Sequence, residues 1–396
     1  MNERPQLNIF SPRHPLWGLA FRCGFLIAAL FAVAAMLRWL AWMGNPADWD
    51  YSLHPTWWHA HEMVFGFALP VVAGFLLTAV ANWTGLPGTT GWRLQLLFGL
   101  WLGARLILWL APGQYLLAWQ AEMLFLLFLT WELGQRVWAR RQWRNLLFIP
   151  VLLLLALLCS ASYMTADDPM RSRQLNYGAT WMIAVLVTIV GGRIIPLFTG
   201  NRLGRKITPL PAAFDYLVIA TTLVIGLAFA TVQRDAAAPW LSPLCLLGAL
   251  LHGIRLARWQ GWRTLRIPLL WSLHLSYACI PLALLGLGLY TSNGNAVMHL
   301  MHLLAIASIG GMILAVMSRV ALGHTGRPLE VPTSITIAFA TVIAAALVRA
   351  LGPIMYPAAT LVWWRLAGAL WIVAFALFLW RYLPILTTRR ADGKPG

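Results

Sequence analysis

Two pairs of histidines have the residue type and spacing of a metal centre. His59 and His61 lie two residues apart in one apolar run, and His299 and His302 lie three apart in another. On a helix, a spacing of two turns the side chains about 200° apart, whereas a spacing of three places them on one face. Imidazole is a common ligand of haem iron and of copper. We therefore predict cofactor binding at these four histidines, against the alternative of interfacial histidines bonded to carbonyls and water.

Three arginines inside apolar runs are candidates for pairing with haem propionates. Arg38 and Arg349 lie near the ends of their runs, and Arg365 lies near the start of its run. If successive runs are antiparallel helices, these positions lie on the same side of the bundle as the four histidines. A guanidinium offers a two-pronged set of hydrogen bonds to a carboxylate, which suits this task. The alternative is that these arginines reach lipid headgroups or pair with acidic residues of the adjoining loop.

Three further ionisable residues, Glu62, Arg105 and Glu122, lie inside apolar runs. Arg105 and Glu122 lie at similar distances from the turn that joins their runs, so a helical hairpin brings them together and predicts an ion pair. Glu62 directly follows His61. Because ionisable groups inside a membrane are costly, all three are also candidates for a proton path.

A second polar set falls at the opposite ends of the runs. It could form a second cofactor site, an anion-binding site or a proton-entry site, and the alternative is that its members cap helices and order loops. His274 and His324 are its candidate metal ligands. The remaining members are Arg193, Asp215, His252, Arg319 and Arg327.

The composition shows which elements must position these residues. Of 396 residues, 60% are hydrophobic and only 10% are charged, with a mean hydropathy of +0.72, which excludes a soluble globular enzyme and a disordered chain. A membrane helix needs about 20 mostly apolar residues. We therefore predict an all-α fold, with residues 1–396 forming one membrane domain of twelve transmembrane helices. The predicted helices are 19–43, 58–82, 93–111, 115–137, 146–164, 178–199, 212–232, 240–258, 267–290, 297–319, 334–352 and 360–386.

The basic residues predict how these helices are oriented. The chain has 29 Lys+Arg against 12 Asp+Glu, a net charge of +17. Of the 29, 22 fall in the N-terminal segment, the even-to-odd loops with their flanking helix ends, and the C-terminal tail, whereas the opposite loops hold three, Arg171, Arg173 and Arg234. Cytoplasmic loops carry an excess of Lys and Arg. Both termini should therefore be cytoplasmic, and the pairs His59/His61 and His299/His302 should lie at the outer side. Nucleic acid binding is not needed to explain the charge.

The cysteines and the known sequence motifs limit which cofactors the chain could bind. Cys23, Cys159, Cys245 and Cys279 all lie in apolar runs and form neither CxxC nor CxxCH, so disulfides, zinc and covalently attached haem are not expected. Any haem should then be a non-covalent haem b. No nucleotide-binding motif is present, which argues against a nucleotide-driven pump.

Several motifs, in the same order along nearly the whole chain, resemble the NnrS family. They are WHAHEM at 58–63, GFLLTAVANWTG at 74–85, GGR at 191–193 with Pro196, PLLWSLH at 268–274, and SR at 318–319 with GHTGRP at 323–328. The resemblance implies a polytopic protein of the bacterial inner membrane that contains haem and copper. It also implies a link to nitric oxide, through denitrification or resistance to nitrosative stress. It brings no assignment of ligands.

A looser analogy, at the level of fold alone, is with the catalytic subunits of haem–copper oxidases and nitric oxide reductases. Those subunits are similar in having twelve helices, with histidine ligands on helices 2 and 10 near the outer side. Here His59 or His61, with His299 or His302, would occupy similar places. The chain departs from that pattern because helix 7 has no adjacent histidine pair and the HxH spacing lies on helix 2.

These observations favour a haem and copper oxidoreductase that acts on nitric oxide. Reduction would require electrons from quinol or from a redox protein, since the sequence has no evident electron-carrier domain. The alternatives are a transporter of a metal or an anionic complex, and a haem-based nitric oxide sensor without turnover.

Overall fold

The computed structural model describes residues 8–49, 53–232 and 239–394. The fold is 83% helical with no strand in the described residues, and twelve helices are long and apolar enough to cross a membrane, which confirms the predicted fold class. Their segments are α1 (Ala20–Gly44), α2 (Pro55–His61), η3 (Glu62–Ala68), α3 (Leu69–Thr84), α4 (Trp92–Leu110), α5 (Tyr115–Ala139), α6 (Phe148–Met164), α7 (Pro169–Leu203), α8 (Ala212–Thr231), α9 (Leu241–Arg258), α10 (Pro268–Leu289), α11 (Gly294–His302), η7 (Leu303–Gly311), α12 (Met312–His324), α13 (Thr333–Met355) and α14 (Thr360–Thr387).

Helix α7 begins well before the predicted residue 178. The Asp168 side chain accepts hydrogen bonds of 3.0 Å from two backbone N–H groups of the first turn, and Pro169 occupies the first helical position. The predicted loop residues Arg171 and Arg173 therefore lie in the first turns of the helix, while Arg234 lies outside the described residues. Hydropathy missed this start because capping turns are polar.

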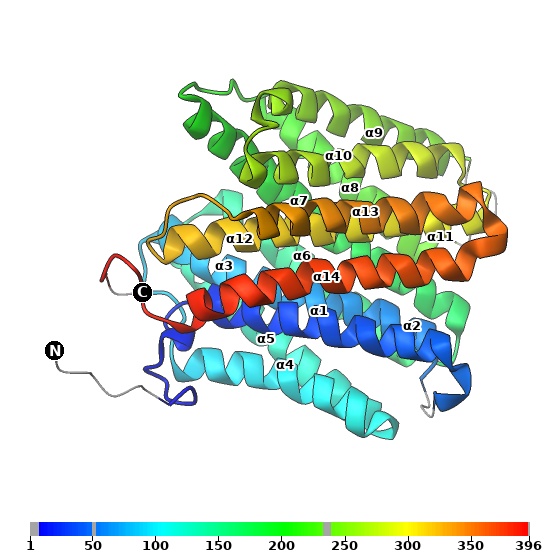
Figure 1. Ribbon diagram of the computed structural model, residues 1–396, viewed down its shortest axis with the longest axis horizontal. Coiled ribbons are helices and arrows are strands. Elements are labelled where there is room, and N and C mark those ends of the chain that lie inside the picture. Colours follow the sequence, from blue (N-terminus) through cyan, green and yellow to red (C-terminus); the bar gives the residue numbers. More distant parts are fainter. Residues whose placement is uncertain (1–7, 50–52, 233–238, 395–396) are drawn as a thin grey trace.

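The helices form a bundle whose two ends differ in character (Figure 1). The first and last described residues lie at one end, which we call the termini end. Segments α2 and α11, which carry the two predicted histidine pairs, lie at the opposite end, called the histidine end. The topology therefore gathers residues far apart in the sequence at one end of the bundle.

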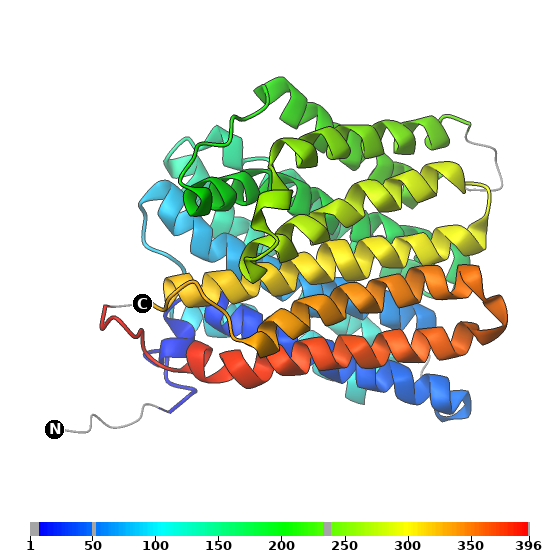
Figure 2. The same ribbon diagram turned by 45° about the horizontal axis from the view of Figure 1, so that its top comes forward.

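Two interrupted helices form the centre of the bundle. In the continuous span of α2, η3 and α3, 78% of the most apolar 18-residue stretch is buried, and in the span of α11, η7 and α12 the share is 83%. By contrast α9 and α4 are 33% and 39% buried and lie at the edges of the bundle (Figures 1 and 2). The outer helices present many exposed apolar side chains, as a lipid-facing surface requires. Examples are Leu102, Leu106, Leu124, Leu127, Leu157 and Leu250.

Both central spans contain a π-helical segment directly after their histidines. These segments are η3 and η7, and each continues into a regular α-helix. A π-helical turn is wider than an α-turn and is frequent at functional sites. Glycines allow neighbours to pack closely here: a Cβ at Gly66 would meet the Phe31 ring, and one at Gly310 would lie 2.5 Å from the Trp371 ring.

The tryptophans near the first loop of the histidine end pack into the bundle and do not form a simple interfacial belt. Trp57 and Trp58 are 2% and 1% exposed. Trp39 and Trp42 pack with ring centroids 4.6 Å apart, and Trp49 contacts Trp58 at 5.6 Å. The cluster packs against the charged and histidine side chains of the interior, so it is part of the core.

Candidate functional site

A cavity of about 540 Å³ lies at the histidine end, between the two central spans and helices α1, α7, α13 and α14. We call it the histidine cavity because His59 and His302 both line it. Its walls are otherwise mostly apolar, and they include five methionines and several aromatic rings. These residues are Met36, Met63, Met170, Met298, Met301, Trp39, Trp57, Trp364 and Trp371.

The two cavity histidines are available as ligands in different ways. The His59 ring stacks on Trp39, with centroids 4.1 Å apart and an interplanar angle of 17°, and its nitrogens have no hydrogen bond within the described residues. His302 Nδ1 lies 2.7 Å from the carbonyl oxygen of Met298, one turn earlier. Since that carbonyl can only accept, Nδ1 carries the proton and Nε2 keeps its lone pair. A bond of this kind typically orients a metal-binding histidine.

His299 has a different environment, although it lies only three residues before His302. Arg349 donates a hydrogen bond of 2.8 Å to its Nδ1, and the ring is not part of the cavity wall. Arg349 itself lines the cavity and lies over the Trp364 ring, with its guanidinium carbon 4.6 Å from the centroid. Arg173 of α7 is the second arginine in the wall.

The other two arginines predicted to pair with propionates make contacts elsewhere. The Arg38 guanidinium lies 5.0–5.3 Å from the ring centroids of Trp49, Trp58 and Trp109. Arg365 donates a hydrogen bond of 2.6 Å to the backbone carbonyl of Met43. Neither side chain is in the cavity wall, so the structure brings Arg349, and not Arg38 or Arg365, next to the cavity histidines.

His61 points into a separate cluster of polar groups buried beside the cavity. Its Nε2 lies 3.0 and 3.1 Å from the two carboxylate oxygens of Glu122, and the Cys159 thiol donates to Glu122 at 3.2 Å. Arg105 forms an ion pair with Glu122 and a second one of 2.9 Å with Glu62. We call these five residues the buried polar cluster.

With both of its carboxylates ionised, the buried polar cluster would carry an excess of negative charge. It holds two carboxylates and one guanidinium, all at most 5% exposed, while the histidine is neutral unless it binds a proton. An uncompensated charge is costly in a buried site. His61 Nδ1, Glu62 Oε1 and the hydroxyl of the adjoining Tyr163 also have no hydrogen-bond partner in the described residues. A bound proton, a cation or water would satisfy these groups.

The donor atoms of the cluster also suit a metal ion. Ligand atoms of His61, Glu122 and Cys159 all lie within 4.8 Å of one another, the one such group of three in the described part of the chain. Imidazole and thiolate are preferred ligands of copper and zinc. Sequence reasoning missed Cys159 and Tyr163 because it considered cysteines only in pairs. The matching depth of Cys159 and Glu122 in successive helices was the available signal.

The polar set at the termini end divides into several places. His252 is bonded at both nitrogens, at 2.9 Å to Thr222 and at 2.9 Å to Tyr277. His274 Nδ1 donates to the carbonyl of Leu270 at 3.0 Å, and the His324 ring packs against Phe21. The structure does not bring these histidines together as one group.

The four remaining members of this set make separate contacts. Arg193 and Asp215 line a large cavity at the termini end. Arg319 lies 3.9 Å from the centroid of the Phe198 ring. Arg327 donates to the carbonyl of Thr325 at 3.4 Å. Neither of these two lines that cavity.

Comparison with known proteins identifies the family. A search of curated proteins finds no match to this chain. The family model described as NnrS protein matches residues 15–390, nearly the whole chain. The chain belongs to the NnrS family. Membership in NnrS indicates a membrane protein of the nitric oxide response, in agreement with the twelve spans.

Proposed function

We propose that this NnrS chain holds haem b in the histidine cavity and reduces nitric oxide there, in resistance to nitrosative stress or in denitrification. The observation that carries the proposal is the presence of His59 and His302 in the wall of one cavity, on the two most buried spans. Haem bound there would supply the iron that binds nitric oxide.

The residues of the cavity fit this cofactor. His302 is oriented by its Nδ1–H bond to Met298, and the His59 nitrogens have no protein partner in the described residues. Arg349 and Arg173 could pair with the two propionates, since guanidinium binds carboxylate through paired hydrogen bonds. The methionines and tryptophans of the wall suit a large apolar ring system.

The buried polar cluster lies directly behind one cavity wall. Trp57 lines the cavity and stacks on His61, with centroids 4.5 Å apart and an interplanar angle of 8°. His61, Cys159 and Glu122 have donor atoms that fit copper, which would supply a second redox centre. Without a metal, the excess negative charge retains a proton, so Glu62 and Glu122 can store and deliver protons beside the cavity.

The proposed reaction combines two nitric oxide molecules, two electrons and two protons to give nitrous oxide and water. The protons come through the buried polar cluster. The proposed electron donor is quinol or a redox protein. The apolar cavity wall keeps bulk water away from the reacting gas, which itself needs no polar contact to enter.

The proposed setting is the bacterial inner membrane, with the termini end in the cytoplasm and the histidine cavity towards the outer side. The bias of 22 basic residues against three supports this orientation. The apolar outer surface of the helices then contacts the lipid bilayer.

The test is nitric oxide consumption by purified protein, followed with an electrode under anaerobic conditions with a reduced quinol analogue. We expect catalytic loss of nitric oxide and formation of nitrous oxide by gas chromatography. His302→Ala should abolish turnover, whereas His14→Ala, a change outside the membrane spans, should leave it intact.

Two other outcomes assign the alternative functions. Binding of nitric oxide to haem without turnover would contradict the enzyme and favour a sensor. Absence of haem, together with uptake of a metal or an anionic complex by proteoliposomes, would contradict the proposal and favour a transporter.

A further inference from the structure

A second large cavity, of about 890 Å³, lies at the termini end among α7, α8, α9 and the loops beside them. Six cationic side chains line it, and Asp215 is the one carboxylate among its described lining residues. We call it the basic cavity. The cations are Arg144, Arg193, Arg205, Lys206, Arg255 and Arg258. Like charges gathered around a cavity repel one another unless an anion compensates them.

Arg255 forms the base of the basic cavity and is only 3% exposed. It donates to the backbone carbonyl of Thr188 at 3.0 Å and to the Tyr277 hydroxyl at 3.2 Å, and it forms an ion pair of 3.0 Å with Asp215. Its Nε has no hydrogen-bond partner in the described residues. Buried polar groups normally have a hydrogen-bond partner. A buried guanidinium N–H without a protein acceptor therefore indicates that a ligand accepts this hydrogen bond.

The interior of the bundle holds Arg255 in place. His252 bonds to Tyr277 at 2.9 Å, and Tyr277 in turn accepts from Arg255. A Cβ at Gly192 would collide with the Arg255 guanidinium, so this glycine leaves the room that the arginine occupies. The adjacent glycine and arginine of the GGR motif therefore build one site: Gly192 admits Arg255, and Arg193 lines the same cavity.

Arg193 is fixed as firmly from the other side. Its guanidinium donates to Asn145 Oδ1 at 2.6 Å and to the backbone carbonyl of Arg144 at 2.9 Å. Basic side chains at a membrane edge commonly extend to lipid headgroups. Arg193 and Arg255 are instead held by protein acceptors, and so are pre-organised around the cavity.

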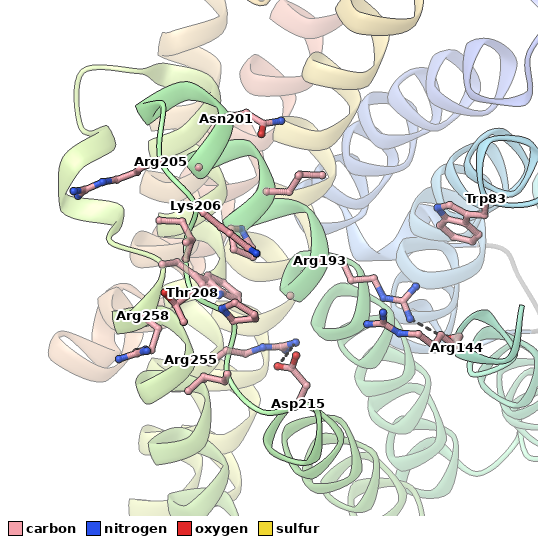
Figure 3. Close-up of a pocket in the computed structure, with 18 of the residues that line it drawn as sticks. Trp83, Arg144, Arg193, Asn201, Arg205, Lys206, Thr208, Asp215, Arg255 and Arg258 are labelled. Carbon is pink, nitrogen blue, oxygen red and sulfur yellow. Dashed lines mark hydrogen bonds and ion pairs between the residues drawn. The ribbon is translucent and has the colours of Figure 1, made fainter.

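The rim supplies further positive charge on the opposite side. Figure 3 shows Arg144 and Arg193 on one side of the cavity, and Arg205, Lys206 and Arg258 on the other. The side chains of Lys206 and Arg258 have no hydrogen bond or ion pair within the described residues. Lys206 and Arg258 are therefore available to a ligand that spans the cavity, whereas Arg205 donates to Gln260 Oε1 at 3.3 Å.

We propose that the basic cavity binds a phosphate-bearing polyanion. Arg193 and Arg255, which the protein holds in place, bind one part of it, and the other cations that line the cavity bind its further negative charges. A guanidinium can donate two parallel hydrogen bonds to two oxygens of one phosphate. Six cations are more than a single small anion such as nitrite needs. The ligand is either a soluble phosphate compound or the headgroup of an anionic lipid, since basic pockets at the cytoplasmic edge bind such headgroups. This proposal is independent of the haem proposal.

The experiment uses the full-length protein in nanodiscs of zwitterionic lipid, with two probes. Inorganic pyrophosphate is titrated by equilibrium dialysis, and cardiolipin is titrated by native mass spectrometry. The test variant is Lys206→Gln/Arg258→Gln, which removes two rim cations without removing a protein bond. The control variant is Arg140→Gln/Arg389→Gln, which removes the same charge from exposed positions outside the cavity.

We expect saturable binding of at least one probe, weakened at least tenfold in the rim variant and less than twofold in the control. Binding of pyrophosphate alone assigns a soluble ligand, and binding of cardiolipin alone assigns a lipid headgroup. If both bind, competition between them assigns one shared site. The proposal is overturned if neither probe saturates, or if the control variant loses as much binding as the rim variant.

Discussion

At the scale of single residues, one short segment contributes to two separate sites. His59 faces the histidine cavity, whereas His61, two residues later, faces Glu122 in the buried polar cluster. The α-helical period alone requires this divergence. In the proposed function, His59 and His302 act on one cofactor, whereas His61 serves protons or a second metal.

A matched pair of variants on α11 tests the ligand assignment. His302→Ala should lower the haem content of the purified protein more than about tenfold, because the residue proposed to hold the iron would be lost. His299→Ala should retain most of the haem, since that ring bonds to Arg349 outside the cavity wall. Haem per chain, measured as pyridine haemochrome, gives the result. Equal loss in both variants would contradict the assignment of His302.

The charge balance of the buried polar cluster predicts a large loss of stability when its one cation is removed. Arg105→Met removes the ion pairs of the buried Glu62 and Glu122 with a guanidinium, and such a change costs about 3–5 kcal/mol. Thermal unfolding in detergent should show a clear fall in Tm. Adding Glu122→Gln and Glu62→Gln to Arg105→Met should recover much of it. If Arg105→Met had the Tm of the unmodified protein, Arg105 would not be needed to compensate the two carboxylates.

At the scale of elements, the π-helical segments η3 and η7 explain how two buried spans can enclose a cavity. Each segment starts directly after a histidine pair and widens the helix next to the cavity. Gly310 permits Trp371 to close the wall there. The shape of the cavity thus depends on backbone geometry as much as on its lining side chains.

A glycine substitution tests this role of η7. Gly310→Ala would force a Cβ against the Trp371 ring, at a cost of about 1–3 kcal/mol for overpacking, and should reduce haem content together with Tm. The control is Gly253→Ala in α9, where a Cβ meets nothing within 4 Å. That change should be neutral or slightly stabilising, because alanine is the better helix former. If Gly310→Ala and Gly253→Ala changed haem content and Tm to the same extent, the close contact of Gly310 with Trp371 would have no special role.

The sequence predicted the elements better than the partners of their side chains. Hydropathy gave all twelve spans, and the hairpin between α4 and α5 gave the pair of Arg105 with Glu122. Nothing local separates His302 from His299, because the choice depends on Arg349 of α13, far along the chain. The place of Arg38 among tryptophan rings likewise depends on packing between distant segments.

At the scale of the whole molecule, the two ends of the bundle have different chemistry. The histidine end holds the apolar cavity with its two histidines, and the termini end holds the basic cavity. The charge bias of the sequence follows the same division. An enzyme of this form would process an uncharged gas at one membrane face and bind an anion at the other.

Cysteine labelling tests the orientation. The four native cysteines are buried, so a membrane-impermeant maleimide should give little background in intact cells. Ser292→Cys, in the exposed loop at the histidine end, should react in intact cells, whereas Lys394→Cys should react only after permeabilisation. The opposite pattern would reverse the membrane orientation.

The central claim is that the histidine cavity holds haem that binds nitric oxide, and the absorption spectrum of the purified protein tests it most directly. Protein from haem-replete cells should show a Soret band, about one haem b per chain, and a shift of that band when nitric oxide is added to the reduced form. A protein that is folded but shows no Soret band, or whose band does not respond to nitric oxide, would contradict the account.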